Sequence, residues 1–446
     1  MGSRISLQVD EISLDFGKNA FWTNHAQLFQ PHNYLPTSHD EDIYEEPPDE
    51  SEPPTGKYVR TLGQTIGRLD LLGYSEDACR SYVKENVEHV IDDTLAANGD
   101  YDDAWVPLEP DWALSALSHV NLDLIKQAQQ DYIEHSSHYT DKPKLVHDWL
   151  ERIQHESKLT NIPTNRFSDV LSFLHLSFDF PNKHPDELCH PYVVLRLLGT
   201  NPSNLDRQVK WDHTDLVAGG WADPNDFLPY LDPTNQILVV TEGSSDASVL
   251  KKSLEQLRPD IADFFYFVDM TENYPFTGTG NLFRFTQGLS SINIQNKTII
   301  IYDNDAEGCF NFNRTTAIER PPHLGVIRLP SLTEFANYPT IGPEGQGQSD
   351  INGRAVSIEL FLKSADDITD PPVRWTSYHE KTATYQGVID TKTDLVKRFM
   401  NPRSHPKNFP RIESLLNELL AEATRISAIA RRYLERGNSH PWTFSS

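Results

Sequence analysis

The chain opens on two short stretches in which apolar and polar residues alternate. Residues 5–9 and 12–16 carry Ile, Leu, Val or Phe at every second position, and Asp10 and Glu11 separate them. A period of two is typical of strands with one buried face. The pattern therefore predicts an N-terminal β-hairpin.

Apolar residues are then spaced three and four apart, which is the period of amphipathic helices. This spacing predicts helices over residues 58–72, 75–97, 111–135, 142–158 and 165–178. Ser75 is expected to cap the second helix, with Glu76 and Asp77 favourably placed in its first turn. Residues 1–230 are thus expected to form one mostly helical α+β domain.

The pattern changes again near residue 235, where short apolar runs without alternation begin. They read QILVVT (236–241), FFYFVD (264–269) and KTIIIY (297–302). Such runs are typical of parallel strands that are covered on both faces. Helical patterns separate them, with leucines at 250, 254 and 257 in the first and residues 282–292 in the second. The alternation predicts a doubly wound α/β domain over residues 231–400.

The composition is that of a globular protein. Of the 446 residues, 38% are hydrophobic and 10% aromatic. No run approaches the roughly eighteen apolar residues of a transmembrane helix, and charges interrupt the N-terminus too early for a signal peptide. Cys79, Cys189 and Cys309 are odd in number and too far apart for a CxxC zinc site. We therefore expect a cytoplasmic protein that makes no membrane contact.

The net charge of −26 is distributed unevenly. Residues 1–110 hold 22 Asp and Glu against 7 Lys and Arg, a net of −15, whereas residues 392–446 hold 5 against 10, a net of +5. Residues 30–56 alone hold eight carboxylates, six prolines and no Lys or Arg. They predict an acidic flexible loop or, alternatively, a partner-binding arm that mimics nucleic acid. The acidic balance argues at first against a nucleic-acid partner.

Two acidic clusters follow the predicted strands. Glu242 and Asp246 come after the first apolar run, and Asp303, Asp305 and Glu307 come after the third. Open parallel sheets bind ligands at the carboxyl ends of their strands, so both clusters are expected at one edge if their strands are neighbours. Clustered carboxylates favour a cation, and hard oxygen ligands suit Mg²⁺ or Mn²⁺. Two such ions can promote in-line phosphoryl displacement. Each cluster alone is a weak signal, because Asp and Asn after a strand are most often turn residues.

The residues around these clusters resemble a known family. VVTEGSSDASVL followed by TIIIYDNDAEG is similar to the Toprim domain of topoisomerases, primases and overcoming-lysogenization-defect nucleases. The resemblance maps the family's glutamate onto Glu242 and its DxD motif onto Asp303 and Asp305. Asp246 matches an extra aspartate of the nuclease-type members. Glu307 falls where these proteins often carry another acidic residue.

Two later segments resemble further parts of those nucleases. DINGRAVSIELFL, from Asp350 through Glu359, is similar to the acidic motif that follows the DxD, and YQGVIDTK ends on Lys392. The resemblance implies that this lysine faces the scissile phosphate or the developing charge. The alternatives are a first-turn helix charge for Glu359 and a solvated surface lysine for Lys392.

The N-terminal residues MGSRISLQVDEISLDFGKNAFWTNHAQLFQ resemble the domain joined to Toprim modules in bacterial HEPN/Toprim-associated proteins, which occur among anti-phage defence genes. No Arg-x4–6-His pair is assigned as the motif of HEPN ribonucleases, so this part is given no catalytic role. Residues 401–446 predict a basic helix with an apolar stripe at 412, 415, 416, 419 and 420. Its Arg425, Arg431 and Arg432 are expected to contact phosphates, or else to form a solvated face.

Together these features predict a Toprim endonuclease that hydrolyses DNA or RNA, with tRNA as one candidate, as the effector of an anti-phage defence system. Catalysis is assigned to Glu242, Asp303, Asp305 and Lys392. Two Mg²⁺ or Mn²⁺ ions are expected on six carboxylates: Glu242, Asp246, Asp303, Asp305, Glu307 and Glu359. The alternatives are a regulated toxin-like subunit and an inactive Toprim binding module controlled by a partner ATPase. The chain lacks a GxxxxGK[ST] loop, so any ATPase would be a separate subunit. A homo-oligomer is also expected.

Overall fold

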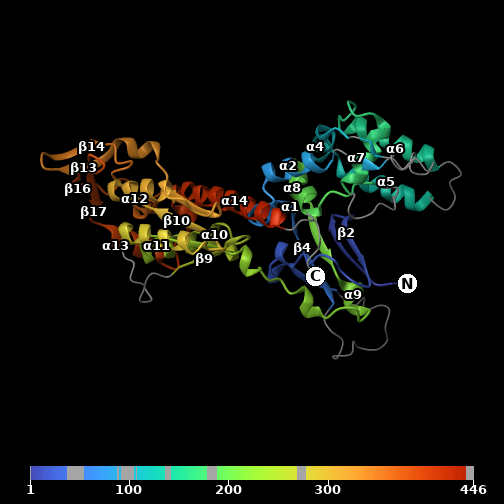
Figure 1. Cartoon of the computed structure of the whole chain (residues 1–446), viewed down its shortest axis with the longest axis horizontal. Coiled ribbons are helices and arrows are strands. Elements are labelled where there is room, and N and C mark those ends of the chain that lie inside the picture. Colours follow the sequence, from blue (N-terminus) through green and yellow to red (C-terminus); the bar gives the residue numbers. More distant parts are fainter. Residues whose placement is uncertain are drawn as a thin grey trace. The chain divides into compact units, whose positions relative to one another are not determined.

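The computed structural model divides into two compact units, residues 1–230 with the residues from 435 on, and residues 231–434 (Figure 1). The described residues are 2–37, 55–87, 90–91, 105–106, 108–135, 142–177, 188–268 and 278–437. Within these ranges no helix is long and apolar enough to cross a membrane.

The first unit is built on a five-stranded antiparallel sheet in the order β2-β1-β7-β4-β3. Its strands are β1 (Arg4–Val9), β2 (Ile12–Lys18), β3 (Tyr34–Pro36), β4 (Gly56–Thr61) and β7 (Gln208–Asp212). The pairing of β1 with β2 confirms the predicted hairpin. The alternate residues Ile5, Leu7 and Val9 are buried, as a period of two requires.

Helices make up most of the remainder of this unit. They are α1 (Leu62–Leu71), α2 (Glu76–Asn86), α4 (Pro110–His119), α5 (Leu122–His135), α6 (Lys142–Glu156), α7 (Thr164–Phe173), α8 (Pro191–Leu198) and α9 (Thr214–Ala218). A short strand pair joins β5 (Val90–Ile91) to β6 (Trp105–Val106). The Ser75 hydroxyl accepts a hydrogen bond from the Ala78 N–H at 3.4 Å, which confirms the predicted cap of α2.

Four of the five predicted helices were wrong in their bounds. The second, expected over residues 75–97, ends at Asn86, and Val90–Ile91 form the strand β5. Residues 58–61 belong to β4. The sequence did not indicate this strand, because Arg60 occupies a core-facing position where a period of two would place an apolar residue. Arg60 is buried and donates from Nη1 to the carbonyl of Leu28 at 2.6 Å. Residues 111–135 form two helices, because the side chain of Asn121 accepts from the Asp123 N–H at 3.0 Å and starts α5 anew.

The acidic loop is narrower than predicted at both ends. Tyr34 pairs with Tyr58 and Pro36 with Gly56, so β3 lies inside the range expected to be flexible. Residues 38–54 lie outside the described residues, as do residues 92–97 of the second predicted helix and residue 178 of the last. The last predicted helix ends at Phe173 within the described range.

The second unit contains a four-stranded parallel sheet in the order β12-β10-β8-β9. Its strands are β8 (Ile237–Val240), β9 (Phe265–Phe267), β10 (Lys297–Tyr302) and β12 (Leu324–Arg328). All six residues of β10 are buried, as predicted for a strand covered on both faces. The predicted α/β class is confirmed for this unit, while residue 269 lies outside the described residues.

Helices connect and cover this sheet. They are α10 (Ser244–Leu257), α11 (Thr279–Ser291), α12 (Ala306–Ala317), α13 (Lys392–Met400) and α14 (Arg411–Gly437). Leu282 and Leu289 of α11 pack with Ile300 and Tyr302 of β10 in one apolar cluster. This helix and α12 therefore lie beside β10, as Figure 1 shows in yellow.

A second sheet in this unit has no counterpart in the sequence-based prediction. It has the order β14-β13-β16-β17 and consists of β13 (Tyr338–Gly342), β14 (Gly345–Ser349), β16 (Val373–His379) and β17 (Thr384–Ile389). A short pair, β11 (Asn304–Asp305) with β15 (Ala355–Val356), lies close to β17. These strands bring late residues to the end of β10.

Candidate metal centre

Two carboxylates meet at the carboxyl edge of the parallel sheet. The strands β8 and β10 are neighbours, so the residues that follow them lie side by side. Oε1 of Glu242 accepts a hydrogen bond from the backbone N–H of Asp303 at 3.1 Å. Asp246 lies in the first turn of α10, which begins directly after Glu242. The two clusters that the sequence places on separate strands are thus brought together.

These carboxylates raise one another's pKa. Burial and the charge of Asp305 raise the pKa of Glu242 to about 8. Burial and the charge of Glu359 raise the pKa of Asp246 to about 7. Burial together with Glu242 and Asp246 holds the pKa of Asp303 well above its usual range. The site therefore concentrates more negative charge than it neutralises, which is the condition that a bound cation relieves.

Asp305 is fixed by hydrogen bonds to both of its oxygens. The Gly308 N–H donates to Oδ1 at 2.7 Å, and the side-chain amide of Gln386 donates to Oδ2. The carbonyl oxygen of the same Gln386 amide accepts from the N–H groups of Ala306 at 2.8 Å and Glu307 at 3.2 Å. Gln386, from β17, therefore ties Asp305 to the start of α12.

Gln386 was not identified from the sequence, although the adjacent Gly387 indicates a close approach of the backbone at this position. A Cβ on Gly387 would lie 2.5 Å from Cγ1 of Val373 and 2.8 Å from Cβ of Ala355. Only glycine lets β17 approach β15 this closely, and that approach carries Gln386 to Asp305. A glycine beside a polar residue inside a strand was the available signal.

Lys392 and Glu359 form an ion pair at the same site. Glu359 is buried on a short 3₁₀ helix, Ile358–Leu362, and its Oε2 lies 3.4 Å from Nζ of Lys392 at the start of α13. Burial lowers the pKa of Lys392, but the charges of Glu359 and Asp303 outweigh it and raise the pKa overall. Glu359 lies in the first turn of its 3₁₀ helix, as its alternative has it, but its side chain is buried, and Lys392 is partly exposed.

Two other acidic residues lie further out. Glu307 is exposed, and its carboxylate contacts Nε2 of His379 at 2.9 Å and the amide of Asn311 at 2.9 Å. Asp350 is exposed in a turn, where Oδ1 accepts from the Asn352 N–H at 2.9 Å. The structure therefore places Glu307 at the rim of the site and does not bring Asp350 into it. His379 is a second contact that the sequence did not reveal.

The arginines of α14 lie away from the carboxylates. Arg425 donates from Nε and Nη2 to the two carboxylate oxygens of Glu422, at 2.7 Å each. Glu422 lies against Gly325, near the first residue of β12. Because β12 runs parallel to β10, this is the opposite edge of the sheet. Arg431 and Arg432 follow on the same helix, so the predicted phosphate contacts are not part of this site.

The spacing of the carboxylates limits how an ion can be held. Among the described residues, the one trio whose ligand atoms all lie within 4.8 Å is Asp131, Glu134 and His135 of α5, which is largely exposed. The site carboxylates are more widely spaced. Mg²⁺ commonly uses one or two carboxylates and keeps several waters, which this spacing allows. Oε2 of the buried Glu359 has Nζ of Lys392 at 3.4 Å as its charged partner. The donor set therefore fits a hard divalent cation.

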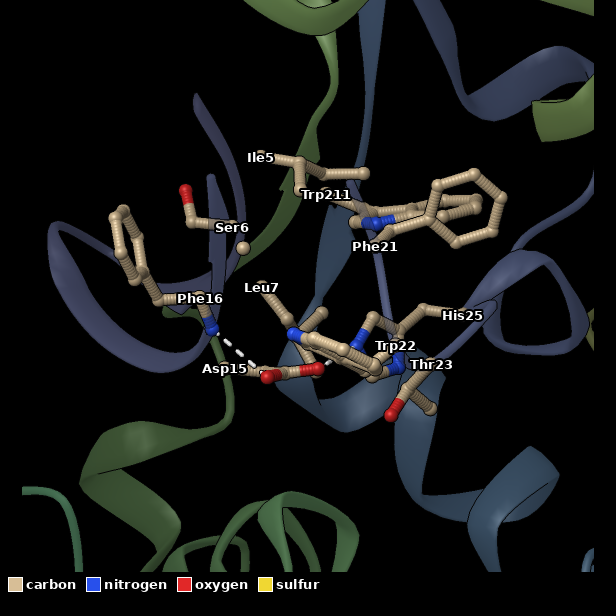
Figure 2. A pocket seen from close by; sticks show the side chains of 11 residues that line it. Ile5, Ser6, Leu7, Asp15, Phe16, Phe21, Trp22, Thr23, His25 and Trp211 are labelled. Atoms are coloured by element: carbon tan, nitrogen blue, oxygen red, sulfur yellow. Dashed lines mark hydrogen bonds and ion pairs between the residues drawn. The ribbon is translucent and has the colours of Figure 1, made fainter. Parts of the chain in front are cut away.

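A pocket in the first unit offers no comparable chemistry. Figure 2 shows it lined by Asp15, His25 and Trp22, among others. Nε2 of His25 contacts Oδ2 of Asp15 at 2.8 Å, and its Nδ1 contacts the Tyr192 hydroxyl at 3.0 Å. The imidazole is 2% exposed. Because both ring nitrogens have partners, this chain of hydrogen bonds holds the fold and leaves no nitrogen for a substrate.

Comparison with known proteins identifies the first unit. Residues 1–235 match the family described as HEPN/Toprim N-terminal domain 1, and this range is more than half of the 446 residues. The match confirms the resemblance noted in the N-terminal residues. No curated protein and no solved structure matches the chain. The chain belongs to the HEPN/Toprim N-terminal domain 1 family.

Proposed function

We propose that the second unit is a Toprim-type catalytic module and that the protein is a divalent-metal-dependent nuclease. The observation that carries this proposal is the meeting of Glu242, Asp246, Asp303 and Asp305 at the carboxyl edge of a parallel sheet, where ligands of such sheets bind. The family supports it independently, because membership in a HEPN/Toprim family points to a nuclease-type role.

In this proposal the residues of the site have three different roles. Glu242, Asp246, Asp303 and Asp305 would hold one or two Mg²⁺ or Mn²⁺ ions, with Glu359 beside them. Bound ions of this kind activate water and stabilise charge on phosphoryl oxygens. Gln386 fixes the orientation of Asp305 through a direct hydrogen bond. Lys392, whose pKa is raised, stays protonated near neutral pH and supplies positive charge toward the reacting phosphate.

The wider biological role belongs to the same proposal. The resemblance to HEPN/Toprim-associated proteins favours an effector of anti-phage defence that acts on DNA or RNA with a separate ATPase or scaffold subunit. The test of the catalytic core is direct. The full chain is incubated with duplex DNA, single strands or tRNA, in EDTA and with Mg²⁺ or Mn²⁺. Cleavage that requires the ion supports the proposal, whereas cleavage that persists in EDTA contradicts it.

Metal binding is expected to stabilise the second unit. An ion at about one hundred times its dissociation constant adds about 2.7 kcal/mol, which raises the melting temperature of a unit of this size by roughly 5–10 °C. Scanning calorimetry with and without Mn²⁺ measures this shift. Glu242→Gln should lose most of it, while Asp263→Asn, an exposed carboxylate before β9, should keep it. An equal shift in Glu242→Gln would show that the ion binds elsewhere.

Removing the Gln386 amide is expected to weaken the site without removing a ligand. Gln386→Ala frees Oδ2 of Asp305 and uncaps two N–H groups of α12. Loss of such a supporting hydrogen bond typically costs about ten- to hundredfold in metal affinity or activity. Isothermal titration with Mn²⁺ measures the change, and Gln348→Ala, at an exposed position of β14 in the same sheet, is the matched control. Identical titrations for both variants would remove Gln386 from the site.

A further inference from the structure

We infer that α12 and the turn between β16 and β17 form a surface that binds the phosphodiester backbone of the substrate beside the carboxylate site. This inference rests on the proposed nuclease function and assigns its substrate-binding surface. We call it the α12 face and define it by six residues: Glu307, Phe310, Asn311, Arg314, His379 and Lys381, of which Asn311 is buried and links its neighbours.

The helical spacing places four of these residues together. Positions 307, 310, 311 and 314 are separated by three and four residues, so their side chains share one side of α12. The hydrogen bonds follow this row. Arg314 donates from Nη1 to Oδ1 of Asn311 at 3.0 Å, and Asn311 donates from Nδ2 to Oε1 of Glu307 at 2.9 Å. A continuous polar row thus leads from the start of α12 to an arginine.

Two positive charges converge on one aromatic ring of this face. Nζ of Lys381 lies 4.6 Å from the centroid of the Phe310 ring, and the guanidinium carbon of Arg314 lies 5.3 Å from it. The Arg314 guanidinium also lies 3.9 Å from the centroid of Phe283. Both cationic side chains are exposed, and within the described ranges neither forms an ion pair with a carboxylate.

This arrangement differs from that of two other arginines in the unit, Arg398 and Arg425, whose charge is already neutralised. Arg398 pairs with Asp367 at 2.6 Å, and Arg425 pairs with Glu422 at 2.7 Å. An aromatic ring holds a cation in place through its quadrupole but leaves the charge uncompensated. An arriving phosphate therefore meets positive groups that are already positioned, and no existing ion pair must first be broken.

The face begins at the proposed metal site. Glu307 follows Asp305 by two residues, and its carboxylate is engaged by His379 at 2.9 Å. His379 also lies against Phe310, with ring centroids 5.7 Å apart. The seven steps from residue 307 to residue 314 span about 10 Å of helix, which is about three phosphates along one strand of a duplex. Arg314 and Lys381 would therefore contact phosphates a few nucleotides from the cleaved bond.

The test compares two double variants of the full chain. Arg314→Gln with Lys381→Gln removes the two cations, whereas Lys251→Gln with Lys407→Gln removes the same charge from exposed positions of the unit outside this face. Binding of a labelled single-stranded oligonucleotide of about twenty nucleotides is measured by anisotropy in Ca²⁺ over a range of salt concentrations. The first variant should bind at least about tenfold more weakly, and its salt slope should fall by about 0.7 for each lost contact. Arg314→Lys with Lys381→Arg should retain binding.

Hydrolysis of bis(p-nitrophenyl) phosphate, which is too small to reach Arg314, separates this surface from the catalytic site. The Arg314→Gln, Lys381→Gln variant should hydrolyse this diester at the wild-type rate. Binding with wild-type affinity and salt slope would overturn the α12 face, as would an equal loss in the Lys251→Gln, Lys407→Gln variant. If the wild-type protein hydrolyses neither the diester nor any polynucleotide, the nuclease proposal is refuted. The binding measurement still tests whether the α12 face binds the oligonucleotide.

Discussion

Asparagine in place of Asp303 is expected to slow phosphodiester cleavage by at least about a thousandfold. Asp303 lies where Glu242 and Asp246 add their charges to its own, so it is central to the proposed ion site. Losing a ligand of an ion that contributes several kcal/mol of transition-state stabilisation costs about 4 kcal/mol, or about three powers of ten in rate. The measurement is the cleavage rate in saturating Mg²⁺ or Mn²⁺, with Asp263→Asn as the control.

The same substitution is expected to stabilise the protein when no ion is present. Asn removes one of several like charges whose repulsion and burial raise their pKa values, so the second unit should melt at a higher temperature in EDTA. The opposite signs of the two effects separate a lost ligand from a damaged fold. A variant that is both inactive and less stable in EDTA would contradict this explanation of the site.

Acid is expected to destabilise the first unit by about 4 kcal/mol between pH 6.5 and pH 5. Burial, followed by the charge of His25, lowers the pKa of His190 to about 3, and burial lowers the pKa of His213 to about 4. Nδ1 of His190 accepts the Tyr192 N–H at 3.1 Å, a bond that protonation would break. Below pH 6.5 these two histidines bind protons in the unfolded chain but stay neutral in the folded unit. Each histidine then costs about 1.4 kcal/mol per pH unit, until the pH reaches its folded pKa.

His213→Phe isolates one of these contributions. The His213 ring stacks on Phe227 with centroids 4.3 Å apart, and neither of its nitrogens finds a hydrogen-bond partner among the described residues. Phenylalanine keeps the stacking and removes the titrating group, so the loss of stability toward pH 5 should shrink by about 1.4 kcal/mol per pH unit. Urea denaturation at several pH values measures the slope, with the exposed His32→Ala as control. Equal wild-type stability at pH 5 and pH 7 would refute the prediction.

The central sheet and the core of the site were predictable because both depend on short-range patterns. A largely apolar run such as residues 297–302, which read KTIIIY, is typical of a strand covered on both faces, and all six side chains are buried. Once β8 and β10 are neighbours, parallel geometry alone brings Glu242 next to Asp303. The order of these strands in the sheet, by contrast, was not predicted from the sequence.

Other features were not predictable because they depend on contacts between distant residues. Arg60 occupies a core position as a charged residue, since a backbone carbonyl receives its guanidinium. The strand β14 is entirely exposed or partly exposed and carries no apolar period at all. Gln386 acts on Asp305 across 81 residues. None of these contacts leaves a periodic trace in the sequence.

The strand order of the first unit has a consequence for how the chain folds during synthesis. Strand β7 sits between β1 and β4, and the Gln208 N–H donates to Oδ1 of Asp10 across 198 residues. Until β7 leaves the ribosome, β1 and β4 each expose an unpaired edge, which is a site for pairing with other chains. At roughly 5–20 residues per second, that wait lasts about 10–40 s. Contacts between residues so distant in sequence also form slowly. We therefore expect the unpaired edges of β1 and β4 to need chaperone protection during synthesis.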